Sequence, residues 1–404
     1  MSRWRASLPA AAAALAAGLA APGADGSVPL VSARLVEAET RFGMALYREL
    51  AAEAPGRNVC VSPASVSAAL AMTWNGARGE TRQAMARALG LEGMSVEEAN
   101  RGHAALQAAL AAADSAVELT LANSLWLRRG VRLVPEFLRA NRGYYGAEVS
   151  ELDFGDPGAP ADVNGWVSRQ TRGKITRIVE RFEPTDILLL ADALYFKGRW
   201  QRPFDPERTE ERPFTLAGGQ AKPVPLMQRA GRFSYCRGAD FQAVDLPYGD
   251  GRFRFLVFLP DEGSSLTLFQ QSLTPEAWQD WLGRFADADG RLGLPRFRLE
   301  TEAVLNDALA ALGMGVALSP GRADFSGIAP PPPNIFIEKV RHKTFVEVNE
   351  EGTEAAAVTS VMMGVTSVSP TPPFVMIVDR PFFWAIRDEA SGAILFLGSV
   401  ADPT

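Results

Sequence analysis

Residue types that usually carry catalysis or bind metal ions are scarce in this chain of 404 residues. It has two histidines, His103 and His342, and two cysteines, Cys60 and Cys236. A zinc site or a disulfide framework needs more of these residues at closer spacing. Cys60 lies in an apolar run and Cys236 lies far along the chain. We therefore expect two separate, inert thiols and no metal site.

The motifs of common enzyme mechanisms are also absent: Gly-x-Ser-x-Gly, His-Glu-x-x-His, a phosphate-binding loop and Cys-x-x-Cys. Gly313 and Gly315 resemble the start of a dinucleotide fingerprint, but they follow a helical pattern at 305–312 and fit a helix cap better. His103 is expected at the surface of an Ala-rich helix, and His342 alone suggests a structural histidine. We predict a protein that is not an enzyme and needs no cofactor. Catalysis by carboxylates alone stays open, although no pair stands out.

The composition is that of a folded protein with a large core. Hydrophobic residues make up 47% of the chain, and 41 Lys and Arg against 47 Asp and Glu give a net charge of −6. A mild acidic excess argues against binding to nucleic acid or acidic lipid. We expect a monomer without nucleic-acid or membrane partners.

The N-terminal stretch has the pattern of an export signal. Arg3 and Arg5 precede an Ala-rich apolar run at 8–21, which Pro22 follows. This order is typical of a secretory signal peptide, here residues 1–24. At about 14 residues the run is too short to span a bilayer. The sequence thus predicts a secreted protein, extracellular or periplasmic, and a disordered Ala-rich tail is the alternative.

The hydrophobic pattern predicts helices in the first part of the chain and strands later. Helical periodicity covers 34–54, and Ser62 with Pro63 supplies the cap and first turn of a second helix. Further helices are predicted at 80–89 and 97–112. Strand patterns lie at 117–127, 187–196, 253–259, 374–377 and 393–400. Because helices and strands do not alternate regularly, the fold class is α+β.

We find neither a long linker nor an internal repeat of fixed period. The proline run at 330–333 is a stiff surface connection. One compact domain over 29–404 is therefore the simplest organisation.

A segment near the C-terminal end has an unusual composition. Alternation at 345–348 predicts a strand, and Gly352 supplies a flexible point after it. The segment around this glycine reads Glu350, Glu351, Gly352, Thr353, Glu354, Ala355, Ala356, Ala357, Val358, Thr359. As a strand it would place Thr353 and every second residue after it on one face, all of them small enough for a sheet interior. An Ala-rich helix is the alternative, which local propensity alone favours.

This segment strongly resembles the hinge of the reactive-centre loop in the serpins. Further matches follow in order along nearly the whole chain, within 58–65, 76–81, 192–200, 294–297, 312–314, 323–327, 379–383 and 394–398. The chain is similar to an inhibitory, secreted serpin of the bacterial type. The resemblance implies an α+β serpin fold with three β-sheets, about eight or nine helices and an exposed reactive-centre loop at about 350–373.

The function that the resemblance implies is suicide inhibition of a serine protease, the partner in a covalent acyl complex. The protease cleaves the loop, and the cleaved loop inserts into the central sheet before the acyl-enzyme hydrolyses. Insertion of 353–366 as a strand would shift the acyl bond by about 45 Å, at roughly 3.3 Å per residue. A carrier or chaperone with the same fold is the alternative, and the small hinge residues argue against it.

Counting from Gly352 in the family's register places the reactive bond between Thr366 and Ser367. A β-branched residue of modest size before that bond suits the shallow, apolar pocket of an elastase-like or subtilisin-like protease, and not a trypsin-like pocket. The segment after Thr366 is longer than is usual in the family. Cleavage after Val368 or after Met363 is therefore the alternative.

The resemblance also implies two clusters that control insertion. The shutter beneath the sheet comprises Ser62, Ser65, Asp192 and His342, and the breach, where the loop first enters, comprises Trp200, Arg296 and Glu350. We expect Arg296 to be the basic partner of Glu350. Asp192 stands where the family usually has Asn, and a buried carboxylate beside His342 would favour the imidazolium. Opening of the sheet is then expected to depend on pH.

Overall fold

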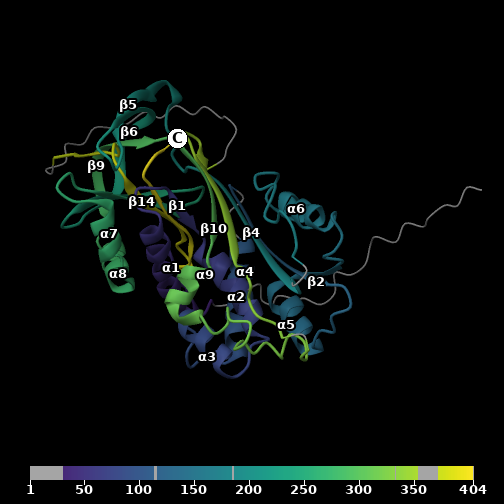
Figure 1. Cartoon of the computed structure of the whole chain (residues 1–404). Helices are drawn as coiled ribbons and strands as arrows, with labels where there is room; N and C mark the ends of the chain where they lie inside the picture. The colour runs from purple at the N-terminus through teal and green to yellow at the C-terminus, as the bar shows by residue number, and fades with distance from the viewer. Residues whose placement is uncertain (1–30, 113–115, 184–185, 333, 354–371, 404) are drawn as a thin grey trace, which may run out of the picture.

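The computed structural model describes residues 31–112, 116–183, 186–332, 334–353 and 372–403. Within these ranges the chain forms two β-sheets and helices that pack around them (Figure 1). The helices are α1 (Ala33–Glu53), α2 (Pro63–Trp74), α3 (Gly79–Ala88), α4 (Val96–Ala111), α5 (Pro135–Tyr145), α6 (Ala159–Gln170), α7 (Leu266–Ser272), α8 (Pro275–Gly283) and α9 (Asn306–Leu309), with short turns η1 (Pro206–Arg208) and η2 (Ala310–Met314). The helices predicted from periodicity are confirmed as α1 to α4.

The site depends on a six-stranded sheet with the order β10-β11-β12-β4-β2-β3. Its strands are β2 (Val117–Arg128), β3 (Glu148–Leu152), β4 (Leu188–Arg199), β10 (Phe297–Val304), β11 (Arg341–Val348) and β12 (Gly352–Thr353). Among the described residues, only β12 pairs with both β11 and β4, through Val348 with Thr353, Thr353 with Gly198 and Gly352 with Arg199. Past these pairs, no ladder joins β4 to β11 within the described part of the chain.

The larger sheet has nine strands, in the order β1-β15-β14-β8-β7-β6-β9-β13 with β5 on β6. They are β1 (Val59–Val61), β5 (Glu210–Thr215), β6 (Ala221–Arg237), β7 (Phe241–Pro247), β8 (Phe253–Pro260), β9 (Ala286–Pro295), β13 (Phe374–Ile377), β14 (Phe382–Asp388) and β15 (Ile394–Val400). The first part of β6 pairs with β5 and its last residues pair with β7. β6 thus joins strands that would otherwise belong to two separate sheets. The described residues therefore form two hydrogen-bonded sheets where three were expected.

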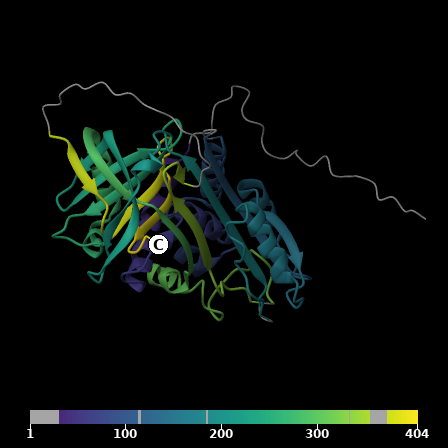
Figure 2. The same ribbon diagram turned by 90° about the horizontal axis from the view of Figure 1, so that it is seen from above.

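The central strands of the nine-stranded sheet are buried on both faces. On β14, Phe382 and Trp384 pack into one hydrophobic cluster, whereas Phe383 and Ala385 pack into another on the opposite face. This alternation follows from the two-residue period of a strand. α7 and α8 cover one face, while α6 packs on the outer side of the six-stranded sheet, away from the nine-stranded sheet (Figure 2). Strands enclosed in this way produce the continuous apolar runs seen in the sequence.

The prediction that His103 lies at the surface is wrong. The side chain is buried between α4 and α1, with Nδ1 3.3 Å from Oε1 of the buried Glu39. The cause is close helix packing: a Cβ built at Gly102 would lie 2.9 Å from Leu35 of α1. An Ala-rich helix with such small residues can approach its neighbour closely, so its polar positions are enclosed as well.

Other expectations from the sequence agree with the structure. Cys60 and Cys236 are free and buried, as separate thiols. Gly313 has a φ of 96° and interrupts the helical segment that begins with α9, as expected of a helix cap. None of the helices in the described residues has the length and apolar character needed to cross a membrane. The predicted signal peptide, residues 1–24, lies outside the described residues.

Candidate functional site

The chain folds back into the sheet immediately after β11. The side chain of Asn349 starts the turn, because its Oδ1 accepts hydrogen bonds from the backbone amides of Glu351 and Gly352 at 3.0 and 3.2 Å. The backbone amide of Asn349 donates to the carbonyl of Gly352 at 2.9 Å. This turn directs β12 into the space between β11 and β4, so the first hinge residues already lie in the sheet.

Gly352 is the position at which the loop backbone meets β4. It has a φ of 153°, and a Cβ built there would lie 2.0 Å from the carbonyl oxygen of Gly198. Any other residue would collide with the β4 backbone, so the close approach of the two chains requires glycine. The flexible point expected from the sequence is thus also a contact point.

Trp200, directly after β4, anchors the turn from below. Its backbone amide donates to the carbonyl of Glu351 at 2.8 Å, and its indole Nε1 donates to the carbonyl of Asn349 at 2.9 Å. The indole stacks on Tyr248, with ring centroids 4.4 Å apart. The Tyr248 hydroxyl lies 2.6 Å from Oγ1 of Thr353. An aromatic platform therefore holds both the turn and the first inserted side chain.

Glu350 and Arg296 form an ion pair beside this platform. Nε of Arg296 donates to both carboxylate oxygens of Glu350, at 2.6 and 2.7 Å. The hydroxyl of Thr209 donates to the same carboxylate at 2.5 Å. Burial alone would raise the pKa of Glu350, but the hydrogen bonds from Arg296 and Thr209 outweigh it and hold the pKa below its ordinary value. Glu350 is 5% exposed, whereas the Arg296 side chain is 43% exposed.

The shutter residues Ser62, Ser65 and His342 meet beneath the sheet. The backbone amide of Ser62 donates to Nε2 of His342 at 3.0 Å, and the hydroxyl of Ser62 caps α2 by accepting from the amide of Ser65 at 3.3 Å. Burial lowers the pKa of His342 to about 4. A neutral imidazole is required here, because only an unprotonated Nε2 can accept the Ser62 amide.

This direction is opposite to the expectation that Asp192 favours the imidazolium of His342. Asp192 pairs with Asn123 in the ladder between β4 and β2, but its side chain lies outside the described residues. The same holds for the remaining hinge residues and for the reactive bond, namely Glu354, Ala355, Ala356, Ala357, Val358, Thr359, Thr366 and Ser367. Their parts in the site stay predictions.

The sequence did not indicate Thr209 or Tyr248 as site residues. Thr209 lies just before β5 and Tyr248 just after β7, 141 and 105 positions away from their partners Glu350 and Thr353. Neither belongs to a periodic pattern or a motif that would mark it. Only the fold brings them to the hinge.

β11 and β4 face each other along edges that are paired only at one end in the described residues. β11 pairs with β10 along its whole length, and β4 pairs with β2 over 188–198. On the facing edges, the described residues show ladder pairs only at Val348 of β11 and at Gly198 and Arg199 of β4. All three residues pair with β12. Among the described residues, the backbone groups along the rest of both edges have no ladder partner. An inserted strand would supply these partners.

Comparison with known proteins gives a consistent assignment. The sequence profile of the family described as Serpin (serine protease inhibitor) matches residues 37–403. The leukocyte elastase inhibitor of Bos taurus is 36% identical over 385 residues, covering 92% of this chain and 100% of that protein. The chain also resembles the native-state crystal structure of the thermophilic serpin tengpin, with a TM-score of 0.85 and 29% identity over 93% of this chain and 96% of that one. Human thyroxine-binding globulin complexed with thyroxine gives a TM-score of 0.83 and 27% identity over 92% and 98%.

Replacing Arg296 by Gln should leave the enclosed carboxylate of Glu350 without its cation. Since an uncompensated buried charge is costly and Arg296 is half exposed, we expect a loss of about 1–3 kcal/mol in the free energy of unfolding, measured by urea titration. Arg291→Gln, an exposed arginine on β9, is the matched control. The double variant Arg296→Gln/Glu350→Gln should recover part of the loss. Equal unfolding midpoints for Arg296→Gln and the control would contradict the role of the pair.

The low pKa of His342 predicts a pH dependence of stability. The unfolded chain binds the proton near the ordinary pKa of about 6.5, whereas the folded chain binds it only near pH 4. Native stability should therefore fall as the pH drops from about 6.5 towards 4, by about 2 kcal/mol at pH 5. In His342→Gln this part of the slope should vanish, and in His103→Gln it should persist. Parallel pH profiles for wild type and His342→Gln, measured by urea titration, would disprove the assignment.

Proposed function

The chain belongs to the serpin family, and on this premise we propose that it is a suicide inhibitor of serine proteases that traps its target as a covalent acyl complex. The observation that carries the proposal is the pair of facing edges on β11 and β4, with β12 placed between them. Relatives named as inhibitors of leukocyte elastase support the general activity, protease inhibition.

The proposed reaction begins as ordinary proteolysis of the reactive-centre loop. The serine hydroxyl of the protease attacks the carbonyl carbon of Thr366, the bond to Ser367 breaks, and the new amino terminus leaves with a proton. The protease then holds Thr366 as an ester, which water would normally hydrolyse. If the loop inserts first, the ester is carried along the sheet with the enzyme attached. The outcome depends on the rate of insertion relative to the rate of deacylation.

The hinge supports fast insertion in two ways. Gly352 and Thr353 already occupy the first positions of the new strand, so insertion needs no nucleation step at the upper end. The Thr353 side chain is 1% exposed and faces Tyr248. In a continued strand, Ala355, Ala357 and Thr359 would share that enclosed face, and none of them is bulky or charged. Small side chains let the sheet close around the loop without overpacking.

The proposed target is an elastase-like or subtilisin-like protease, because Thr366 would fill a shallow, apolar primary pocket. The name of the bovine relative, leukocyte elastase inhibitor, agrees with this choice. Cleavage after Val368 or after Met363 would also present an apolar residue. An adduct with elastase together with the sequence of the released peptide would distinguish the three bonds.

A second candidate function is a non-inhibitory carrier. The likeness to thyroxine-binding globulin favours it, since that protein has this fold and is complexed with thyroxine. The small residues of the hinge favour the inhibitor. The two functions differ in one measurable respect, because only an inhibitor forms an adduct with a protease that survives denaturation.

We also propose that the protein is secreted, on the strength of residues 1–24 and their signal-peptide pattern. Sequencing the amino terminus of the protein recovered from culture medium or periplasm tests this proposal. A mature chain that starts near residue 25 supports export. A chain that retains Arg3 and Arg5 in the cell contradicts it.

Thr353→Arg should convert the inhibitor into a substrate. The guanidinium would have to enter the enclosed position beside Tyr248, which slows insertion while the bond at Thr366 stays cleavable. Mixed with elastase, the variant should be cut with less than about a tenth of the wild-type adduct yield, since a tenfold rate difference needs only about 1.4 kcal/mol at the insertion barrier. Denaturing electrophoresis measures both products.

Thr366→Arg is the matched control, since it places the same charge in the loop but outside the hinge, at the last residue of the segment that would insert. It should redirect adduct formation from elastase to trypsin, whose primary pocket takes a cation. An unchanged adduct yield in Thr353→Arg would contradict the insertion mechanism. Loss of the adduct with both proteases in Thr366→Arg would contradict the assigned bond.

A further inference from the structure

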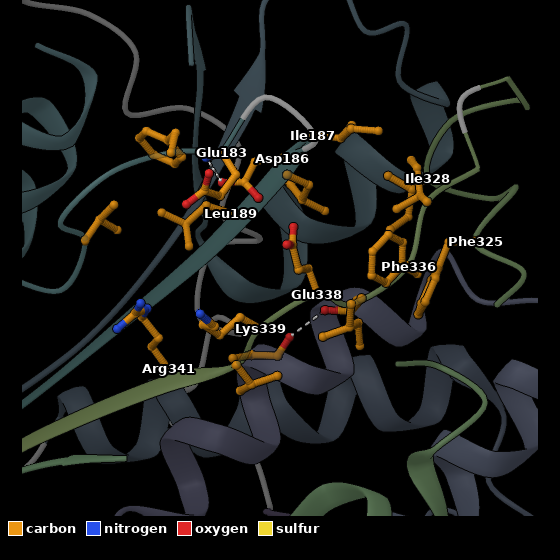
Figure 3. A pocket seen from close by; sticks show the side chains of 18 of the residues that line it. Glu183, Asp186, Ile187, Leu189, Phe325, Ile328, Phe336, Glu338, Lys339 and Arg341 are labelled. Carbon is orange, nitrogen blue, oxygen red and sulfur yellow. Dashed lines mark hydrogen bonds between the residues drawn. The ribbon is translucent and has the colours of Figure 1, made fainter. Parts of the chain in front are cut away.

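A cavity of about 780 Å³ lies beneath the six-stranded sheet, between the beginnings of β4 and β11 and next to α2. This volume is in the range that binds small organic molecules. Figure 3 shows the ribbons of β4 and β11 well apart where they border the cavity. Much of the wall is apolar and includes Leu70, Phe182, Leu189, Phe325, Ile328 and Phe336. The cavity is separate from the breach and adjoins the shutter through Ser65 and His342.

One end of the cavity is acidic. Asp186 precedes β4 and Glu338 precedes β11, and in Figure 3 their carboxyl groups point toward one another across the cavity. A hydrogen bond with Asp186, burial, and the negative charges of Asp186 and Glu183 raise the pKa of Glu338 to about 7. Glu338 is therefore partly protonated near neutral pH and becomes charged above it.

The neighbouring cations do not neutralise this pair. Arg128 donates to the backbone carbonyl of Glu183 at 3.3 Å. Arg181 pairs with the Glu183 carboxylate at 2.7 Å, and Arg341 pairs with Glu302 at 3.2 Å. The charge of Lys339, next in sequence, partly opposes the rise in the pKa of Glu338, but in Figure 3 its side chain extends away from the carboxyl pair. No lysine or arginine in the described ranges forms an ion pair with Asp186 or Glu338. A proton thus occupies the place that a cation would otherwise take.

We propose that this cavity binds a small organic ammonium compound, with its nitrogen between Asp186 and Glu338 and its apolar body against the phenylalanine wall. An ammonium group has three donors for the two carboxylates. Phe325 and Phe336 offer aromatic surface for the apolar body, and an aromatic face also attracts cations. A bare metal ion would leave the apolar part of the cavity unused, and no group of three or more metal-ligating side chains occurs in the described residues.

Such a ligand would connect the two strands that loop insertion has to separate. It would contact Asp186 ahead of β4 and Glu338 ahead of β11, and a new strand between them needs a spacing of roughly 4.8 Å on each side. A ligand that loses contacts in the inserted state shifts the equilibrium toward the uninserted one. We therefore expect it to slow inhibition. This consequence rests on the proposed function, whereas binding itself does not.

The test titrates the full chain with 2-phenylethylammonium chloride in a calorimeter at pH 6 and pH 8. The amine is charged at both pH values, while Glu338 with a pKa of about 7 goes from mostly protonated to mostly charged. Affinity at pH 8 should exceed that at pH 6 by up to about tenfold. Glu338→Gln should bind the amine at least about tenfold more weakly at pH 8 and show no pH effect. Glu211→Gln, on the exposed strand β5, is the matched control and should bind like wild type.

Two further probes separate the charge from the apolar body. 2-Phenylethanol and 3-phenylpropionate should bind at least about tenfold more weakly than the amine. Equal affinities for all three probes, equal binding by Glu338→Gln and wild type, or a response to magnesium chloride in place of the amine would overturn the proposal. If the amine binds as expected but the protein forms no protease adduct, the site stands and the proposed function fails.

Discussion

The structure depends on a row of backbone peptide groups that have no ladder partner in the described residues. They lie along the facing edges of β4 and β11. Peptide groups that face each other without a ladder partner have to rely on solvent or side chains. The fold nevertheless keeps the two strands in one sheet, because β12 bridges them at the upper end and α2 and the shutter residues support them from below. Both the proposed insertion of the loop and the cavity beneath the sheet depend on this arrangement.

Where β12 pairs with β11 and β4, a close contact between two backbones lies beside a partly buried ion pair. Gly352 lets the loop backbone touch β4, and Trp200 holds the turn through two donors. The carboxylate of Glu350 is kept ionised in an enclosed place by Arg296 and Thr209. These contacts hold the first two loop residues in the sheet without requiring that the rest follow. In the proposed mechanism, the same region would retain the loop before cleavage and guide it afterwards.

Local sequence patterns predicted the helices and strands in which the apolar residues have a clear arrangement. The helices α1 to α4 and the strands β2, β4, β8, β13 and β15 were predicted because their apolar residues have a regular period or form continuous runs. The long strand β6 has exposed positions along much of its length and includes Gly231, so no such pattern marks it. His103 was misplaced because the close packing of Ala-rich helices is a tertiary effect.

The site itself could be predicted only in part. The hinge composition and Gly352 were visible in the sequence, whereas the choice of Arg296 as partner for Glu350 depended on the family resemblance. Thr209 and Tyr248 join the site through the fold alone. The protonation state of His342 could not be predicted from the sequence either. It depends on burial, which opposes the imidazolium charge that Asp192 was expected to favour.

The central claim is that the native sheet is incomplete and that the loop completes it. The most direct measurement compares thermal unfolding of the intact chain with that of the chain cleaved once within 360–369, by calorimetry under identical conditions. At roughly 1 kcal/mol for each new backbone hydrogen bond, insertion of the cleaved loop should raise the unfolding temperature by more than about 20 °C. An unfolding temperature that cleavage leaves unchanged or lowers would contradict the claim.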